Sequence, residues 1–280
     1  MEGVVLRGVW LVVVWLVWSG VAEGQRLWGR EAGGVGSGGL ASVSLWGAGD
    51  GWNVSGLGDV EGVRVSAGGV LPWGLKELME GSVCVVVGGR LCSVGGRVMV
   101  SGGEMSHFTT FGGDVARRFG RVRVGVGYRG MTHKIRYMET GRTSFSVAGV
   151  MVSATERWDI GVAVRNLERR GMWYGGKERE IGTTWWGSVM WRARRVFSIC
   201  VEMEKELRER GSEDWVGRVG VGMKVGGGLG FTTGFSTLGA ELGAGVGYEW
   251  ERWGVRAGVS HHEILGVSGG ACVTFHSKRL

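Results

Sequence analysis

The segment from Leu238 to Trp250 alternates without a break, and it constrains the fold more than any other stretch of the chain. One set of alternate positions is apolar and ends in Tyr248 and Trp250, while the other carries glycines with Glu241 and Glu249. A period of two residues indicates a β-strand whose two faces meet different surroundings. Soluble strands are usually about 5–6 residues long, whereas a strand that crosses a membrane needs about 9–11. The segment therefore predicts a membrane-crossing strand with its apolar face toward lipid.

Similar segments follow one another from Gly81 onward, and Arg121 to Arg129 is the clearest of them. Its valines alternate with arginines, which a dry protein core tolerates only when they are paired but a polar lumen accommodates. Tryptophans stand at strand ends, as in the aromatic belts of membrane proteins; they are Trp158, Trp215, Trp250 and Trp253. We expect an all-β protein, a transmembrane antiparallel up-and-down β-barrel of about 12–14 strands in the cell outer membrane.

The same alternation assigns side chains to the two faces of the barrel wall. We predict that the lipid-facing side chains include Val122, Val124, Val126, Tyr128, Leu242, Val246, Tyr248 and Trp250. We predict that the lumen-facing side chains include Arg121, Arg123, Arg218, Lys224 and Glu241. The expected partners of the outer face are the lipid bilayer and lipopolysaccharide.

The N-terminal part of the sequence has a different pattern from the alternating segments. Residues 1–24 have a basic start, an apolar run from Val9 to Val17 and small residues at Ala22 and Gly24, which is typical of a signal peptide. The alternative is a membrane anchor, but the run is shorter than the roughly 20 residues that a spanning helix needs. We expect residues 25–60 to form a Gly-rich plug or the first wall strand, residues 61–276 the barrel, and residues 277–280 a tail.

Within residues 25–60, only Leu40 to Trp46 alternates, so the segment fits a plug inside the barrel mouth. Glycines there permit unusual backbone angles, and Asn53 can satisfy backbone groups in a tight turn. The plug interpretation places Trp46 and Trp52 against the inner wall and Asn53 in the tight turn. Pro72 to Glu80 has a helical composition with proline near its start.

Composition excludes several classes of protein. The chain has 58 glycines, one proline and 44% apolar residues without a Gly-X-Y period, which excludes collagen and disfavours disorder. Its net charge of +7 is spread along the chain and mixed with acids, so we expect no nucleic-acid partner. The cysteines lack Cys-x-x-Cys spacing and fit either a Cys84–Cys92 disulfide or four thiols; they are Cys84, Cys92, Cys200 and Cys272.

Catalytic and cofactor chemistry is not indicated. Two Gly-x-Gly-x-x-Gly matches, at 34–39 and 125–130, lack the strand, helix and acidic residue of a dinucleotide site. No histidine has metal-ligand spacing, and His261-His262-Glu263 is interpreted as a polar loop. We expect no catalytic residue, no cofactor and no metal.

Several motifs resemble a known family. Gly38 to Leu45 followed by Trp52 to Leu57 is similar to the N-terminal signature of PorV/PorQ-type outer-membrane proteins of Bacteroidetes, within the FadL-like barrel group. Similar late motifs are Val201–Leu207, Gly243–Tyr248 and Gly258–Ser268. Val54 and Ser55 depart from the proline and alanine of that signature. The resemblance implies a monomeric barrel that serves type IX secretion or the passage of hydrophobic solutes, with secretion-system proteins or such a solute as partner.

The functional prediction is therefore a non-enzymatic outer-membrane barrel that supports secretion or passes hydrophobic solutes. One alternative is a secreted all-β surface binding protein or adhesin. An outer-membrane barrel enzyme is the second alternative.

Overall fold

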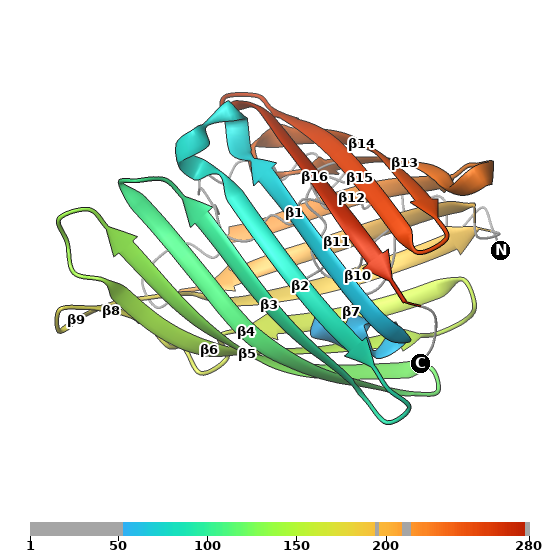
Figure 1. Ribbon diagram of the computed structural model, residues 1–280, viewed down its shortest axis with the longest axis horizontal. Helices are drawn as coiled ribbons and strands as arrows, with labels where there is room; N and C mark the ends of the chain where they lie inside the picture. The colour runs from blue at the N-terminus through green and yellow to red at the C-terminus, as the bar shows by residue number, and fades with distance from the viewer. Residues whose placement is uncertain (1–52, 194–195, 209–213, 278–280) are drawn as a thin grey trace.

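The computed structural model describes residues 53–193, 196–208 and 214–277, and it shows one antiparallel sheet that closes on itself (Figure 1). Two of the sixteen strands lie outside the ring, so fourteen form the wall, and the pairings β1–β16 and β5–β6 complete the ring. The wall strands are β1 (Gly62–Leu71), β2 (Glu80–Gly88), β3 (Ser93–Gly102), β4 (Ser106–Phe119), β5 (Val122–Ile135), β6 (Gly141–Ser153), β7 (Trp158–Arg165), β10 (Thr183–Ala193), β11 (Phe197–Leu207), β12 (Asp214–Lys224), β13 (Leu229–Ser236), β14 (Glu241–Trp250), β15 (Trp253–His262) and β16 (Gly266–His276). A closed barrel excludes the two-sheet sandwich that the adhesin alternative requires.

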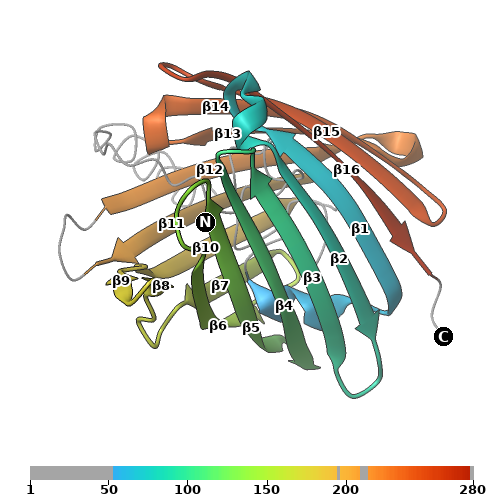
Figure 2. The ribbon, with the colours of Figure 1, turned by 60° about the vertical axis from the view of Figure 1, so that its left-hand side comes forward.

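The two ends of the barrel differ in their connections. The end where β1 begins and β16 finishes has short turns, such as residues 120–121 and 251–252. The other end has longer loops, including residues 72–79 and 166–182 (Figure 2). Outer-membrane barrels keep short turns on the periplasmic side and long loops outside. The end with the short turns is therefore the periplasmic end.

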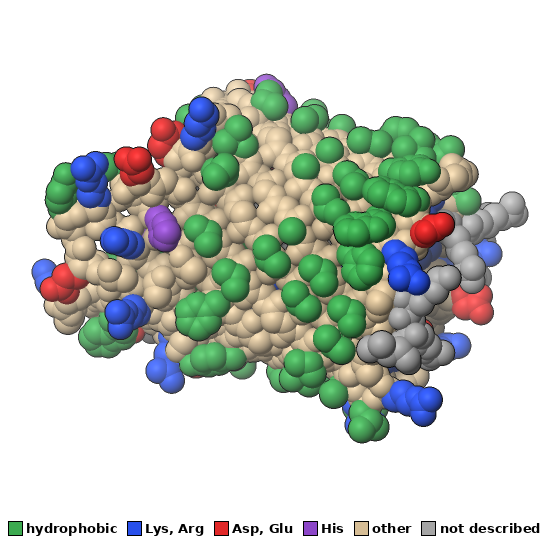
Figure 3. Space-filling view, in the orientation of Figure 1, with side chains coloured by type: hydrophobic (Ala, Val, Ile, Leu, Met, Phe, Trp, Pro, Cys, Tyr) green, Lys and Arg blue, Asp and Glu red, His purple; other side chains and the backbone are tan. Residues whose placement is uncertain are grey.

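Burial alternates along the wall strands as the sequence pattern predicts. On β5 the side chains of Val126 and Tyr128 are 57% and 55% exposed, whereas Arg123 and Arg129 are buried. The exposed apolar side chains cover the outer face (Figure 3). Aromatic rings gather at its periplasmic end, with ring centroids 6.4 Å apart for Trp158–Trp191, 6.4 Å for Trp191–Phe197 and 5.0 Å for Trp253–Phe275. Such a ring of aromatic side chains is typical of the lipid interface.

The remaining two strands, β8 (Met172–Tyr174) and β9 (Lys177–Arg179), form a hairpin at the extracellular end. The hairpin exists because β7 stops at Arg165 while its neighbour β6 continues to Gly141. The free edge of β6 then pairs with β8 through Arg142 and Trp173.

Several predicted boundaries are wrong. The strand expected from Leu238 begins at Glu241, because Gly239 and Ala240 have φ of 66° and 48° and form a 3-10 turn, η6 (Leu238–Ala240). The predicted helix at Pro72–Glu80 consists of two 3-10 turns, η3 (Pro72–Gly74) and η4 (Lys76–Leu78), before β2 begins.

The structure also bears on His261 and His262, on two further strands and on the cysteines. The expected polar loop at His261 and His262 is the end of β15, where both residues pair with β16. Strands β1 and β13 were not predicted individually. The structure forms no disulfide between Cys84 and Cys92, and all four cysteines lie in the described ranges as thiols. Among the described residues, no helix is long and apolar enough to cross a membrane.

Candidate functional site

A short 3-10 turn, η2 (Val54–Asp59), lies inside the barrel against β4, β5 and β6. Asn53 caps it: its Oδ1 accepts hydrogen bonds from Ser55 N at 3.2 Å and from Ser55 Oγ at 2.6 Å. Asn, rather than the proline of the resembled signature, therefore fixes this turn. Val54 and Leu57 are each 1% exposed, so η2 is packed against the wall rather than lying loosely in the lumen.

The wall is shaped to receive η2. A Cβ at Gly125 of β5 would lie 2.6 Å from the carbonyl carbon of Val54, and a Cβ at Gly149 of β6 would lie 2.1 Å from Asn53 Oδ1. Only glycine leaves room for such a close approach of backbone to wall. These two glycines explain part of the glycine content of the strands.

Ion pairs tie η2 to the periplasmic end of the wall. Asp59 forms salt bridges with Arg118, at 3.2 Å, and with Arg123 of β5. Arg123 also reaches Asp159 of β7 at 2.7 Å, and Asp159 is paired in turn with Arg192 of β10. Because each buried charge has an opposite partner, the cluster is compatible with burial, and it crosslinks η2 with β4, β5, β7 and β10.

Above η2, a continuous apolar stripe follows the inner face of the wall toward the extracellular end. Its members are buried and lie on η2, β5, β6 and β8; they are Val54, Met131, Phe145, Val147 and Met172. Phe145 is 0% exposed and Val147 is 1% exposed. Partly buried Phe108, Tyr174 and Ile181 pack against the stripe. Barrel interiors are ordinarily polar, so these buried apolar side chains depart from the usual lining of the inner face.

Charged pairs and smaller apolar clusters share the rest of the inner face. Arg129 of β5 binds Asp114 of β4 at 2.7 Å, and both side chains are almost fully buried. Arg218 of β12 binds Glu202 at 3.0 Å and Glu204 at 2.7 Å, both on β11. Buried ions require such partners, because an unpaired one costs several kcal/mol, roughly 3–5. Buried ion pairs therefore flank the apolar stripe on β5 and continue on β11 and β12.

An aromatic cluster stands at the extracellular end of the stripe. The ring of His133 stacks on Phe108, with centroids 3.5 Å apart and an interplanar angle of 17°. Its Nε2 lies 2.9 Å from Ser106 Oγ and its Nδ1 lies 2.5 Å from the hydroxyl of Tyr174 on β8. Burial raises the pKa of Tyr174 above its ordinary value of 10.0. These contacts hold the β8–β9 hairpin against the extracellular end of the stripe.

The loop before the hairpin is also fixed. Asn166, in the left-handed region at φ 56°, donates through Nδ2 to the carbonyls of Arg170 at 3.0 Å and Ile181 at 2.7 Å. Glu168 accepts from the backbone N–H of Ser146 at 2.6 Å and from its hydroxyl at 2.7 Å. These bonds occupy the edge of β6 that β7 leaves unpaired.

The predicted site residues fall into three groups. Val122, Val124, Val126, Tyr128, Leu242, Val246, Tyr248 and Trp250 are exposed on the outer face. Arg123, Arg218 and Glu241 are buried on the inner face, and Ser260 donates a hydrogen bond to Glu241. Arg121 does not line the lumen wall, whereas Lys224 shares the inward alternation of Arg218 and lies exposed at the periplasmic rim. Arg121 lies in the turn before β5 and donates to Ala154 O at 3.4 Å, while Lys224 ends β12 and pairs with Glu249 at 3.5 Å.

Of the predicted plug residues, Asn53 is the one that the structure describes; Trp46 and Trp52 lie outside the described residues, as do the signal segment 1–24 and the candidate strand Leu40 to Trp46. Sequence reasoning missed the stripe. Phe145 to Val152 looked mixed because both of its faces are apolar, and that feature itself could have indicated an apolar inner face. Within the described ranges, no group of three His, Cys, Asp or Glu side chains could hold a metal ion.

Comparison with known proteins supports the fold. No family model and no curated protein matches the sequence. The crystal structure of the P. putida toluene transporter TodX is similar, with a TM-score of 0.65 at 10% identity, covering 90% of this chain and 100% of that one. Two mutants of the TodX monoaromatic hydrocarbon channel have TM-scores of 0.64 and 0.61 at 9% and 8% identity, covering 88% and 89% of this chain and 98% and 99% of theirs. At such low identity the likeness concerns the fold: the chain is a closed fourteen-stranded β-barrel of the outer membrane.

Proposed function

We propose that this protein passes small hydrophobic molecules across the outer membrane as a monomeric, non-enzymatic barrel. The observation that carries the proposal is the apolar stripe on the inner face, which joins Val54 of η2 to Met172 of β8. The side chains of the stripe are at most 5% exposed, so a solute contacts them only by displacing what packs over them. An apolar solute that does so gains free energy by leaving water, whereas a hydrophilic solute gains nothing. The stripe therefore favours hydrophobic over hydrophilic cargo.

The arrangement along the stripe supports a directed route. Phe108 and Tyr174 form an aromatic entrance at the extracellular end, and η2 lies at the periplasmic end of the stripe. Ligand sites are usually apolar surfaces with a few fixed polar groups, and here His133 and Tyr174 provide those groups. TodX, which has a similar fold, is called a toluene transporter and a monoaromatic hydrocarbon channel.

Uptake of a labelled monoaromatic hydrocarbon into cells that express the protein tests this function. Met172→Gln places a polar amide in the stripe, on a hairpin outside the barrel wall, and should reduce uptake several-fold. Met190→Gln is the matched control, because Met190 is an equally buried inward residue in a separate cluster with Met151 and Cys200. Heat-modifiable migration confirms that both variants fold. Equal uptake by the two variants, or no uptake above vector cells, contradicts the proposal.

We further propose that residues 25–60 act as a plug, with Trp46, Trp52 and Asn53 against the inner wall. The seating of Asn53 and η2 supports this at one end of the segment. Deleting Gly33 to Gly51 and recording single-channel conductance is the test. A plug predicts that a nearly closed barrel becomes conductive while remaining heat-modifiable, whereas loss of folding would identify the segment as wall.

Support of secretion is the second candidate. It rests on the resemblance of Asn53–Leu57 to the PorV/PorQ-type signature, a stretch that forms the capped turn inside the barrel. Crosslinking in cells followed by identification of the captured proteins distinguishes the two functions. Capture of secretion-system proteins by the wild type, and their loss when η2 is altered, supports this second role. If no secretion-system protein is captured, solute passage is the remaining proposal.

A further inference from the structure

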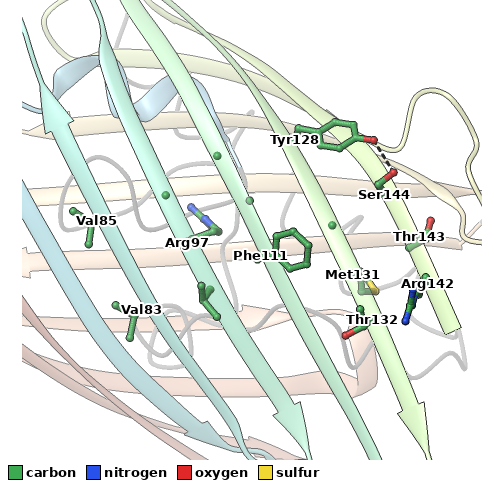
Figure 4. A pocket seen from close by; sticks show the side chains of 15 residues that line it. Val83, Val85, Arg97, Phe111, Tyr128, Met131, Thr132, Arg142, Thr143 and Ser144 are labelled. Carbon is green, nitrogen blue, oxygen red and sulfur yellow. Dashed lines mark hydrogen bonds between the residues drawn. The ribbon is translucent and has the colours of Figure 1, made fainter. Parts of the chain in front are cut away.

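An apolar groove of about 800 Å³ crosses the outer face of the barrel over β2 to β6 (Figure 4). Its floor contains Gly96 of β3 and Gly113 of β4, which are paired in register and carry no side chains. Val85 and Tyr128, their neighbours on the adjoining strands, form the two sides. The groove is thus a gap in an otherwise continuous layer of apolar side chains.

The sides of the groove are fixed in place. The ring of Phe111 lies over Gly130, where a Cβ would be 2.5 Å from its Cζ atom. The hydroxyl of Tyr128 donates to Ser144 Oγ at 2.6 Å. A groove with such fixed sides keeps its shape without a ligand, which lowers the entropic cost of binding one.

Basic side chains stand directly above the groove, at its extracellular end. His107 and Lys134 are paired across β4 and β5, and Arg142 of β6 is one pair further along the same face. Figure 3 shows basic side chains and a histidine at this end, beyond the apolar side chains. Neither Lys134 nor Arg142 forms a salt bridge with a carboxylate in the described part of the chain. By the diagonal spacing of paired strands, their Cβ atoms are roughly 7–8 Å apart.

We propose that this face binds a phosphorylated, multiply acylated lipid of the outer leaflet, with its phosphate between Lys134 and Arg142 and an acyl chain in the groove. The choice of ligand follows from the order of groups along the barrel axis. Cations lie at the level of lipid headgroups, and apolar surface lies below them toward the bilayer centre. Arg and Lys donors bind phosphate strongly, and the valines, Phe111 and Met131 that line the groove suit an acyl chain. This site is on the outer face and is independent of the solute route in the lumen.

Native mass spectrometry of the purified barrel, titrated with lipid A as the probe and with phosphatidylglycerol as a singly phosphorylated comparison, tests the site. The double variant Lys134→Gln/Arg142→Gln should weaken lipid A binding about tenfold, about 1.4 kcal/mol. Arg117→Gln is the control, because Arg117 is on the same face of β4 at its periplasmic end, stacked over Phe119 at 4.8 Å. Wild-type affinity in the double variant, or an equal loss in Arg117→Gln, overturns the phosphate site.

The groove is tested separately. Gly96→Leu fills its floor, and it fits the backbone because a Cβ there would meet nothing closer than Gly112 O at 4.0 Å. This variant should weaken lipid A binding about tenfold while leaving binding of the free headgroup sugar phosphate unchanged. Unchanged lipid A affinity shows that no chain occupies the groove and overturns that half of the proposal. Phosphatidylglycerol has two acyl chains and one phosphate, so its binding as tightly as lipid A by wild type overturns selection for the more heavily acylated and phosphorylated lipid.

Discussion

Asn53 and Gly149 interlock: the side-chain oxygen of Asn53 lies where a side chain on Gly149 would begin, 2.1 Å from the position of a Cβ. The same oxygen accepts the two hydrogen bonds that cap η2. The turn inside the lumen and the glycine in the wall are therefore two halves of one contact, and a change in either affects the other.

Gly149→Ala should displace η2 and destabilise the barrel by about 1–3 kcal/mol, because the added methyl group overlaps Asn53. Gly187→Ala is the control, since a Cβ at Gly187 meets nothing within 4 Å. The control should be neutral or slightly stabilising, by about 0.4–1 kcal/mol. Urea unfolding in lipid vesicles measures both. Equal midpoints for the two variants would show that η2 does not occupy this position.

Val126→Arg should destabilise the barrel by about 2–4 kcal/mol, since it places a charge toward the hydrocarbon near the middle of β5. Val126 lies nearer the middle of β5, which extends to Ile135, than Val124, which lies near its periplasmic end. Arg121→Ala, in the exposed turn, should change stability by less than about 0.5 kcal/mol. Comparable losses at both positions, measured by the same unfolding assay, reject the lipid-facing assignment.

Arg218→Met should cost about 3–5 kcal/mol, because it leaves Glu202 and Glu204 buried without their cation. Lys224→Met is the matched control on the same strand, since its pair with Glu249 is exposed and worth about 0–1 kcal/mol. A mild effect of Arg218→Met would mean that water or another cation reaches the two glutamates.

The β8–β9 hairpin should loosen in acid. Burial raises the pKa of Glu168, but hydrogen bonds from its own backbone and from Ser146, together with the charge of Arg170, outweigh burial and lower that pKa below 4.5. A lowered pKa means that the carboxylate stabilises the loop above its ordinary pKa and that this stabilisation disappears as the pH falls through the lowered value. Protection factors from hydrogen exchange of residues 166–181, which remove the pH dependence of intrinsic amide exchange, measure the change at neutral and acidic pH. In Glu168→Gln the difference between the two pH values should vanish; its persistence would assign the effect to another group.

The wall could be predicted where its two faces differ chemically. On β5, valines alternate with arginines, so the period is visible in the letters. On β13, Leu229, Phe231 and Phe235 do share the outer face, but Thr233 interrupts that apolar set and the strand is only 8 residues long, so its alternation is harder to recognise. Local backbone angles set the boundary of β14 instead of hydrophobicity, since Gly239 and Ala240 take positive φ.

The way in which several strands assemble the apolar stripe could not be predicted from the sequence, for a different reason. Phe145 and Val147 share a strand, but Met131 reaches them through the β5–β6 register and Met172 through a hairpin that pairs with β6 at a single position. Such contacts depend on which strands become neighbours, and a single sequence does not specify that. Asn53 was identified because side-chain capping is local, whereas its contact with Gly149 is not.

The unequal lengths of nearby wall strands set how far each part of the wall rises above the membrane. β5 has 14 residues, while β7, two strands away, has 8. With a rise of ~3.3 Å per residue and a tilt of ~40°, β5 reaches a height of ~35 Å and β7 ~20 Å. The outward apolar set of β5 ends at Tyr128 and is followed by Thr132 and Lys134, so it is no longer than the set from Trp158 to Val164 on β7. The extra height of β5 therefore stands beyond the hydrocarbon layer, and the wall rises out of the membrane on the flank where the β8–β9 hairpin begins.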